Sequence, residues 1–500
     1  MRRRILEFGL LAAIFLAAGG MGGTPPIPRS LAEILLFALG LLYLVTAPST
    51  APRAFAKLLP LPLALCAWIA FQWFASRRGE IGLDPYSIES RGLVVVACFV
   101  AFFLALEASR ERAARTRFVL ALIALGLLES FYGLAQYFGG WQYIWNTPRR
   151  YYLGSASGTF INHNHFAGLL EMILPLALAL ALYHAQKARS HARPRSRGEF
   201  LGDLGRPHLL KCLLLLLAST ILFLGIFFSF SRMGMISMLA SLALLAAAVL
   251  LGRSRNPQPV GFIIVLAVCG IATAAWLGAA PVVEHFEALA HGDPLERGAE
   301  GRRVLWSDAL KLVRAHPFAG SGLGCFEIAF ASVQSAELDY TIDHAHNDYL
   351  EFAVELGLPA AALLFAAFFW LVARALQAAY LARSGLSRAH ALGAACGVSA
   401  LLVHSLADFN LQIPANALVF SALLGLGSAV SLELRAEPAK SSRDSASAPL
   451  AQSQRAQAPM SAAAQANLSV EESQQAKALE EIEVPVEVPV ELSVNVPRSN

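Results

Sequence analysis

LLKCLLLLLASTILFLGIFFS, residues 209–229, is an apolar run in which Lys211 is the only charged residue. An α-helix of this length, rising 1.5 Å per residue, crosses the roughly 30 Å hydrocarbon core of a bilayer. The run therefore predicts a transmembrane helix.

The composition of the whole chain agrees with that prediction. Of the 500 residues, 56% are hydrophobic and 15% are charged, whereas soluble domains carry about 25% charged residues. This composition indicates a membrane protein and argues against an ordinary soluble domain.

Similar apolar runs of roughly 17 to 25 residues recur along the chain, about twelve in all. We therefore expect an all-α, polytopic membrane bundle of about 12 transmembrane helices occupying residues 1–434. The predicted spans are 5–22, 29–47, 57–75, 92–108, 118–138, 165–185, 209–229, 234–251, 260–281, 348–373, 390–408 and 415–433.

Lys and Arg collect in alternate loops, as the positive-inside rule requires if the N-terminus is cytoplasmic. The predicted inner loops hold Arg53 and Lys57, Arg110 to Arg117, the basic stretch 186–208, Arg253 and Arg255, and Arg374 to Arg388. Both termini are then expected in the cytoplasm, and the net charge of +4 reflects topology and no nucleic-acid surface. The first span also resembles a secretory signal peptide, and its cleavage would leave the remaining topology unchanged.

Two segments lie outside this pattern of spans. Residues 282–347 form one large periplasmic segment, in which Val304, Leu305, Ala309, Leu312 and Val313 recur at helical spacing before Pro317. From residue 435 to 500 the chain is rich in Ala, Ser, Gln, Pro and Glu, which predicts a disordered cytoplasmic tail. Five of the six cysteines fall in spans, and no Cys or His spacing indicates a metal site.

With this topology, the unusual polar residues converge on the outer face from five separate segments. The candidate site residues are Asn162 and Asn164, with His163 and His165 beside them; Arg232; Arg302 and Arg303; His344, His346, Asn347, Glu351 and Glu355; and His404 and Asp408. His404 and Asp408 are four residues apart, which would place them on one helical face.

Each of these residues also has an ordinary structural reading. A single arginine at a span end commonly extends to lipid headgroups, and Asn or His at a helix start commonly caps the helix or lies at the interface. The paired Arg302 and Arg303 can simply begin a solvated helix, and the "GSGLG" at 320–324 is best read as a turn. Asp348, Glu351 and Glu355 share a helical face, and carboxylates in a membrane cost several kcal/mol unless paired, so a purely structural reading is weakest for them.

Their convergence on one face indicates chemistry with a polyanion. Arginine forks and a helix N-terminus bind phosphate oxygens. A histidine beside them can take a proton from a hydroxyl, because its ordinary pKa is near 6.5. The residues thus suggest group transfer from a lipid-linked phosphate or pyrophosphate.

Several of these motifs resemble the bacterial O-antigen ligase and O-antigen polymerase superfamily of membrane glycosyltransferases. They are "HNDYLEFAVELG" (346–357), the preceding "RRVLWSDALKLVRAHPFAGSGLGCF" and "SRMG" (231–234), with "GTFINHNHFAGLLEM" and "HSLADFNLQIPAN" also similar. The likeness covers roughly residues 150–430. Ala360 stands where the strict ligase pattern expects Gly, Thr or Tyr, so the motifs specify the superfamily better than the member.

The resemblance implies a fold like that of the type C glycosyltransferases and an undecaprenyl-pyrophosphate-linked glycan as donor, with no metal or cofactor. It implies that His346 is the base that activates the acceptor hydroxyl, and that Arg232 with Arg302 or Arg303 holds the pyrophosphate. The remaining candidates would support these residues, although His344 either assists His346 or faces water.

We therefore expect a glycan transferase in the bacterial inner membrane, acting in surface polysaccharide assembly. Its acceptor would be lipid A core, a growing polysaccharide or a protein. The alternative from another class is a transporter or flippase of lipid-linked oligosaccharide. Inverted repeats and midplane sites are typical of transporters, and we find neither in this sequence. A scaffold for a polysaccharide assembly complex is a third possibility.

Overall fold

The computed structural model describes residues 2–46, 58–79, 84–190, 207–251, 299–335 and 341–436. Three parts of the sequence prediction lie outside the described residues: the ninth span (260–281), the first part of the periplasmic segment (282–298) and the tail from residue 437. So do Arg53, Lys57, Arg253 and Arg255.

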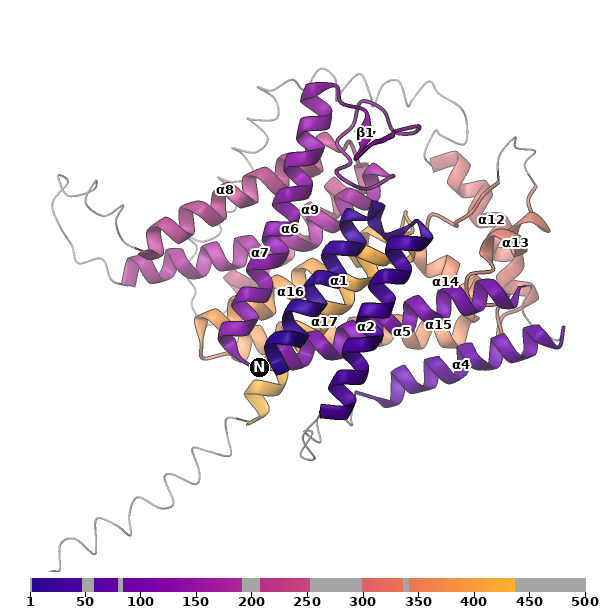
Figure 1. Cartoon of the computed structure of the whole chain (residues 1–500), viewed down its shortest axis with the longest axis horizontal. Coiled ribbons are helices and arrows are strands. Elements are labelled where there is room, and N and C mark those ends of the chain that lie inside the picture. Colours follow the sequence, from indigo (N-terminus) through magenta and orange to yellow (C-terminus); the bar gives the residue numbers. More distant parts are fainter. Residues whose placement is uncertain are drawn as a thin grey trace, which may run out of the picture. The chain divides into compact units, whose positions relative to one another are not determined.

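The described residues form helices and one short hairpin (Figure 1). The first half contains α1 (Arg2–Gly19), η1 (Met21–Gly23), α2 (Pro26–Thr46), α4 (Pro60–Arg77), α5 (Pro85–Ala108), α6 (Arg112–Gly139), the paired strands β1 (Tyr143–Ile144) and β2 (Thr147–Pro148), α7 (His163–Ser190) and α8 (Pro207–Phe228). The second half contains α9 (Arg232–Leu250), α12 (Ala299–Ala315), α13 (Phe326–Ala331), α14 (Asp348–Leu356), α15 (Leu358–Leu381), α16 (Gly385–His404), η4 (Asn410–Gln412) and α17 (Pro414–Ala436).

The prediction of an all-α polytopic bundle is confirmed. Nine helices of the described residues are long and apolar enough to cross a membrane. Every predicted span in the described residues contains a helix. Two of these helices, α1 and α4, are each 18 residues long and are not among the nine.

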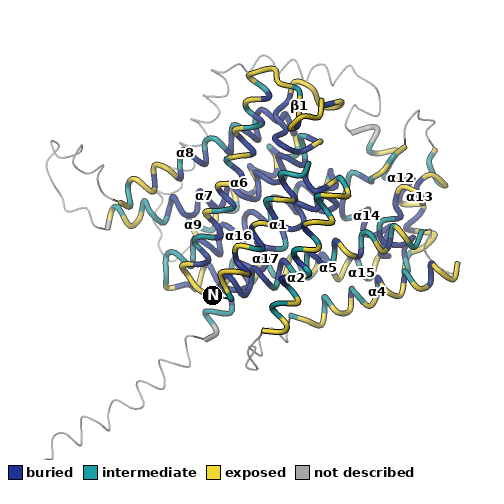
Figure 2. The backbone as a smooth tube through the Cα atoms, viewed as in Figure 1, coloured by how far each residue is buried: buried dark blue, intermediate teal, exposed yellow. Residues whose placement is uncertain are grey.

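Helix α7 lies at the centre of the bundle. It packs against α16 and α8 most extensively and also against α6 and α9. Its side chains from Phe166 to Leu182 are buried, whereas the outer helices show alternating buried and exposed positions (Figure 2). Exposed Leu and Phe side chains on α2, α4 and α8 are what lipid-facing helices present.

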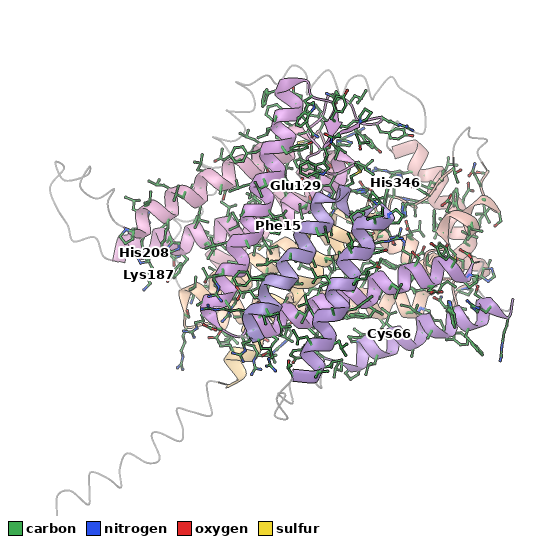
Figure 3. The ribbon with its side chains drawn as sticks, viewed as in Figure 1. Phe15, Cys66, Glu129, Lys187, His208 and His346 are labelled. Carbon is green, nitrogen blue, oxygen red and sulfur yellow. The ribbon has the colours of Figure 1, made fainter. Side chains whose placement is uncertain are left out.

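Charges from the predicted inner loops gather at one end of the bundle. Arg117 Nη2 lies 2.7 Å from Glu7 Oε2 and Arg115 Nη2 lies 2.7 Å from Glu433 Oε2, while Arg3 pairs with Glu107. Figure 3 places His208 and Lys187, from the basic stretch 186–208, on the far side of the bundle from His346. The cationic end and the candidate site therefore lie at opposite ends of the bundle.

The predicted tenth span, 348–373, is wrong in one respect, because it is two helices. Gly357, with φ 81° and ψ 158°, separates α14 from α15, and Pro359 follows in the first turn of α15. The backbone N–H of Leu358 donates to Pro317 O at 2.8 Å and so leaves the helical pattern. Helix α14 is thus a short helix of its own before the membrane helix α15.

Two smaller predictions also need correction. Helix α16 ends at His404, so Asp408 lies in the following turn and not on the same helical face. The turn forms because the carbonyls of Ser405 and Asp408 accept the backbone N–H of Asp348 at 3.0 and 3.2 Å. On α12, Leu305, Ala309, Leu312 and Val313 are buried as expected, whereas Val304 is exposed.

Candidate functional site

The site is assembled around the turn that follows α16. The carboxylate of Asp408 is 1% exposed and lies among three imidazoles. Its Oδ1 is 3.5 Å from Nδ1 of His346 and 3.8 Å from Nε2 of His165, and its Oδ2 is 3.8 Å from Nε2 of His404. Three elements, α7, α16 and the loop before α14, therefore meet at one carboxylate.

Phe409 holds the histidines in place. Its ring stacks on His344 at a centroid distance of 4.0 Å and meets His165 and His346 edge to face at 4.6 and 4.9 Å. Phe409 directly follows Asp408 in the chain. The turn that positions Asp408 therefore also positions the ring that contacts the imidazoles.

His346 is the most solvent-exposed of the three histidines around Asp408. Its side chain is 33% exposed, against 0% for His404 and 7% for His165. Its backbone φ is 48°, a left-handed conformation that non-glycine residues adopt uncommonly. The following Asn347 caps α14, its Oδ1 accepting the N–H of Leu350 at 3.1 Å. A strained residue immediately before a helix N-terminus is typical of a side chain held for function.

The carboxylates of α14 are all buried. Glu351 Oε1 lies 2.7 Å from Nδ1 of His344, and its Oε2 accepts the N–H of Ala345 at 2.8 Å. Burial raises the pKa of Glu351 to about 8 and lowers the pKa of His344 to about 3. One proton is thus shared by a neutral pair, and Glu351 fixes His344, whose side chain is 14% exposed.

Asp348 and Glu355 accept hydrogen bonds that join α14 to neighbouring segments. Asp348 Oδ2 accepts the Ser405 hydroxyl at 2.6 Å and the Leu411 N–H at 3.1 Å, which joins α14 to the turn after α16. Glu355 accepts the N–H of Phe326, and its carbonyl accepts Gln72 Nε2 at 2.9 Å, so it lies at the "GSGLG" turn. Burial raises the pKa of Glu355 to about 8.

The charge of Asp408 contrasts with these carboxyls. Burial alone would raise its pKa, but attraction to His165 and His346 holds the pKa well below the ordinary value. Asp408 is therefore the ionised carboxylate of the cluster.

Arg302 lies within electrostatic range of Asp408, and Arg232 lies within electrostatic range of Arg302. Half-buried Arg302 interacts electrostatically with Asp408, Arg232 and Tyr152. Burial lowers its pKa and Asp408 opposes that effect, and guanidinium groups stay charged in any case. Arg232 is exposed at the first turn of α9, where Ser231 caps the helix by accepting the N–H of Gly234. Arg303 is exposed, and no described contact joins it to the cluster.

Asn162 and Asn164 lie at the start of α7, where Asn162 Oδ1 accepts the backbone N–H of Asn164 at 2.8 Å. Asn162 also donates to the hydroxyl of Tyr152 at 3.4 Å. Their described contacts are those of a helix start, and they do not touch His346.

Sequence reasoning missed three residues of this arrangement, Glu171, Phe409 and Arg91, and it named a fourth, His165, without giving it a role. Glu171 on α7 lies 3.1 Å from Nδ1 of His404, and Phe409, Arg91 and His165 complete the surroundings of the histidines. Glu171 carried a signal, because a carboxylate inside an apolar run is costly without a partner. His165 was visible as part of a polar run, whereas nothing in the sequence marks Phe409.

No group of three or more His, Cys, Asp or Glu side chains in the described residues is arranged to hold a metal ion. The donors present are instead arginines, histidines and a helix N-terminus, which suit an anionic ligand.

Fold and site together define a multi-pass membrane protein with a histidine, aspartate and arginine cluster at one end of its bundle. Residues 217–365, less than a third of the chain, match the family model described as "O-Antigen ligase". The match contains Arg232, Arg302, His346 and all of α14, and it confirms the resemblance to the O-antigen ligase and polymerase superfamily. No curated protein matches the chain. The family supports glycan transfer of the ligase or polymerase type in surface polysaccharide assembly, in a multi-pass membrane protein.

Proposed function

We propose that the protein transfers a glycan from an undecaprenyl-pyrophosphate-linked donor to an acceptor hydroxyl at the periplasmic face of the bacterial inner membrane. The observation that carries the proposal is the partly exposed His346 beside the ionised, buried Asp408, with Arg302 within electrostatic range of Asp408 and Arg232 within electrostatic range of Arg302.

His346 is the general base. Its Nδ1 faces Asp408, so Nε2 is the ring nitrogen that receives the proton of the acceptor hydroxyl. Asp408 stabilises the imidazolium that forms and orients the ring, as carboxylates do in other imidazole-based sites. His404 and His165 lie on the other sides of Asp408, and His404 pairs with Glu171.

The acceptor oxygen forms a bond to the anomeric carbon of the glycan as the bond from that carbon to the pyrophosphate oxygen breaks. The electron pair leaves with the pyrophosphate, whose growing negative charge Arg302 and Arg232 stabilise. We assign no such role to Arg303. Asn347, Glu351 and His344 hold the loop that carries His346.

The experiment that tests this function is reconstitution in liposomes with donor and acceptor on one side of the membrane. A glycan transferase releases undecaprenyl pyrophosphate and lengthens or modifies the acceptor. If unchanged donor appears on the opposite side instead, and no undecaprenyl pyrophosphate is released, the protein is a flippase and the proposal is wrong.

A further inference from the structure

An apolar groove lies between helices α4, α5, α15 and α17, away from the cluster around Asp408. It encloses about 1240 Å³ of space, part of it open to the outside. Helix α4 packs along α5, and Trp68 and Gln72 tie its outer half to the C-terminal end of α14. In the described residues α4 does not pack closely against α15, and this separation leaves the groove.

The polar outer end of the groove consists of Arg91 and Gln412. Arg91 Nη1 donates to the carbonyl of Gln412 at 2.7 Å. The Gln412 side chain lines the groove and is 5% exposed, and its Nε2 has no hydrogen-bond partner in the described residues. A buried amide donor without an acceptor costs about 1–3 kcal/mol. A ligand with anionic oxygens beside Arg91 would satisfy it.

The groove extends about halfway through a membrane. Its lining residues on α5 run from Arg91 to Phe102, about 17 Å at the helical rise of 1.5 Å per residue. The hydrocarbon core is about 30 Å thick, so the groove spans one leaflet. Its length matches a hydrocarbon chain that extends through one leaflet from a polar head at Arg91.

The polar end of the groove adjoins the catalytic cluster. Arg91 interacts electrostatically with His344 and Glu351, and His344 stacks on Phe409, which contacts His346. Leu411 and Gln412 line the groove only a few residues after Asp408. Arg302, by contrast, acts on Asp408 and has Arg232 beside it. Cationic side chains from two different parts of the chain, Arg91 and Arg302, therefore lie near the cluster around Asp408.

We propose that this groove binds the hydrocarbon chain of a lipid-borne acceptor, with the acceptor's anionic head at Arg91 and Gln412 and its hydroxyl at His346. The inference rests on the proposed function, in which Arg302 and Arg232 already hold the donor pyrophosphate. A second cation at the end of a separate apolar groove is then available to the second substrate. The acceptor is thereby a lipid-linked glycan and not a protein.

The test uses the full-length protein in liposomes, with donor and lipid-borne acceptor extracted from a strain that lacks the enzyme. The second acceptor is the same saccharide after removal of its lipid. Ser421 lies on α17 and lines the groove. We expect Ser421→Trp, which fills the groove, to raise KM for the lipid-borne acceptor at least tenfold. KM for the donor and the rate with the delipidated acceptor should stay unchanged.

Leu63→Trp is the matched control, because Leu63 lies on α4, is 62% exposed and does not line the groove. It should leave every parameter unchanged. Arg91→Gln should reproduce the rise in KM for the lipid-borne acceptor, and it serves as the second variant if Ser421→Trp does not fold.

A rise in KM for the donor instead would assign the groove to the donor chain and overturn the proposal. Unchanged KM values in Ser421→Trp and Arg91→Gln would also overturn it, because the groove would then hold only bulk lipid. Equal KM values and rates of the native protein with the lipid-borne and the delipidated acceptor would also overturn the proposal. Failure of the proposed function looks different, since the native protein would then release no undecaprenyl pyrophosphate with either acceptor.

Discussion

At the scale of single residues, the proposed mechanism requires one ionised carboxylate among carboxyls that burial keeps neutral. Asp408 has three imidazoles around it, whereas Glu351 and Glu355 have backbone donors and few charges of opposite sign. The protonation states of Asp408 and the α14 carboxyls therefore differ although all of them are buried.

Replacing Asp408 by Asn should lower kcat for glycan transfer by about 10² to 10⁴-fold, because the imidazolium of His346 loses its counter-charge. KM for the donor should change by less than about threefold. The measurement is steady-state release of undecaprenyl pyrophosphate by folded, purified protein. Asp343→Asn is the control, since Asp343 is exposed in the same loop. An Asp408→Asn enzyme that keeps its full kcat would remove Asp408 from the mechanism.

The raised pKa of Glu355 predicts that the stability of the protein depends on pH. Its folded pKa of about 8 lies above the ordinary value of 4.5, so between these values the folded protein keeps a proton that the unfolded chain has released. Stability therefore falls as pH rises from about 4.5 to about 8 and levels off above that range.

Glu355→Gln, which cannot ionise, should reduce this slope without abolishing it, because Glu351 and Asp348 also have raised pKa values. Thermal unfolding in detergent from pH 5 to 9 measures the effect. Glu327→Gln, at an exposed position of α13, should keep the slope of the native protein. Parallel curves for the native protein and Glu355→Gln would show that Glu355 is ionised throughout.

At the scale of elements, the break between α14 and α15 sets the position of His346. The "GSGLG" turn docks on the C-terminal end of α14, where Ser321 and Gly322 donate to the carbonyls of Val354 and Glu355 at 2.8 and 3.0 Å. A side chain at Gly357 would place its Cβ 2.2 Å from the carbonyl oxygen of Phe318. The break therefore requires glycine for two reasons, its backbone conformation and this close approach.

Gly357→Ala should destabilise the protein by about 2–4 kcal/mol, since its φ of 81° and the clash both act against alanine. Thermal unfolding of the purified protein measures the loss. Gly139→Ala is the matched control, because a Cβ at that helical position of α6 meets nothing within 4 Å. Equal melting temperatures for the two variants would mean that the break tolerates a side chain.

The sequence predicted the helices better than the links between them. Apolar length and the distribution of Lys and Arg are local properties, so they located every span that the structure describes. The break at Gly357 depends on the docking of a turn some 35 residues earlier in the chain, which no local pattern shows. Polar residue types revealed His346, His404 and Asp408, whereas Arg91 and Phe409 belong to the site only through tertiary contacts.

At the scale of the whole molecule, paired charges and the histidine cluster lie at opposite ends of the bundle. The topology proposed from the positive-inside rule assigns the charged end to the cytoplasm. A cysteine introduced at exposed Tyr151 should then react with a membrane-impermeant maleimide in intact cells with a permeable outer membrane. A cysteine at exposed Arg383, between α15 and α16, should react only after lysis. The reverse pattern would invert the proposed topology.

The proposed reaction depends above all on His346 as the base for glycan transfer. The most direct measurement is undecaprenyl pyrophosphate release by His346→Ala in liposomes that contain donor and acceptor. His316→Ala is the control, because His316 is an exposed histidine of the same outer segment. We predict that His346→Ala loses about 10² to 10⁴-fold in rate while it keeps its melting temperature, and that His316→Ala matches the native protein. A His346→Ala protein that releases undecaprenyl pyrophosphate at the native rate would contradict the account.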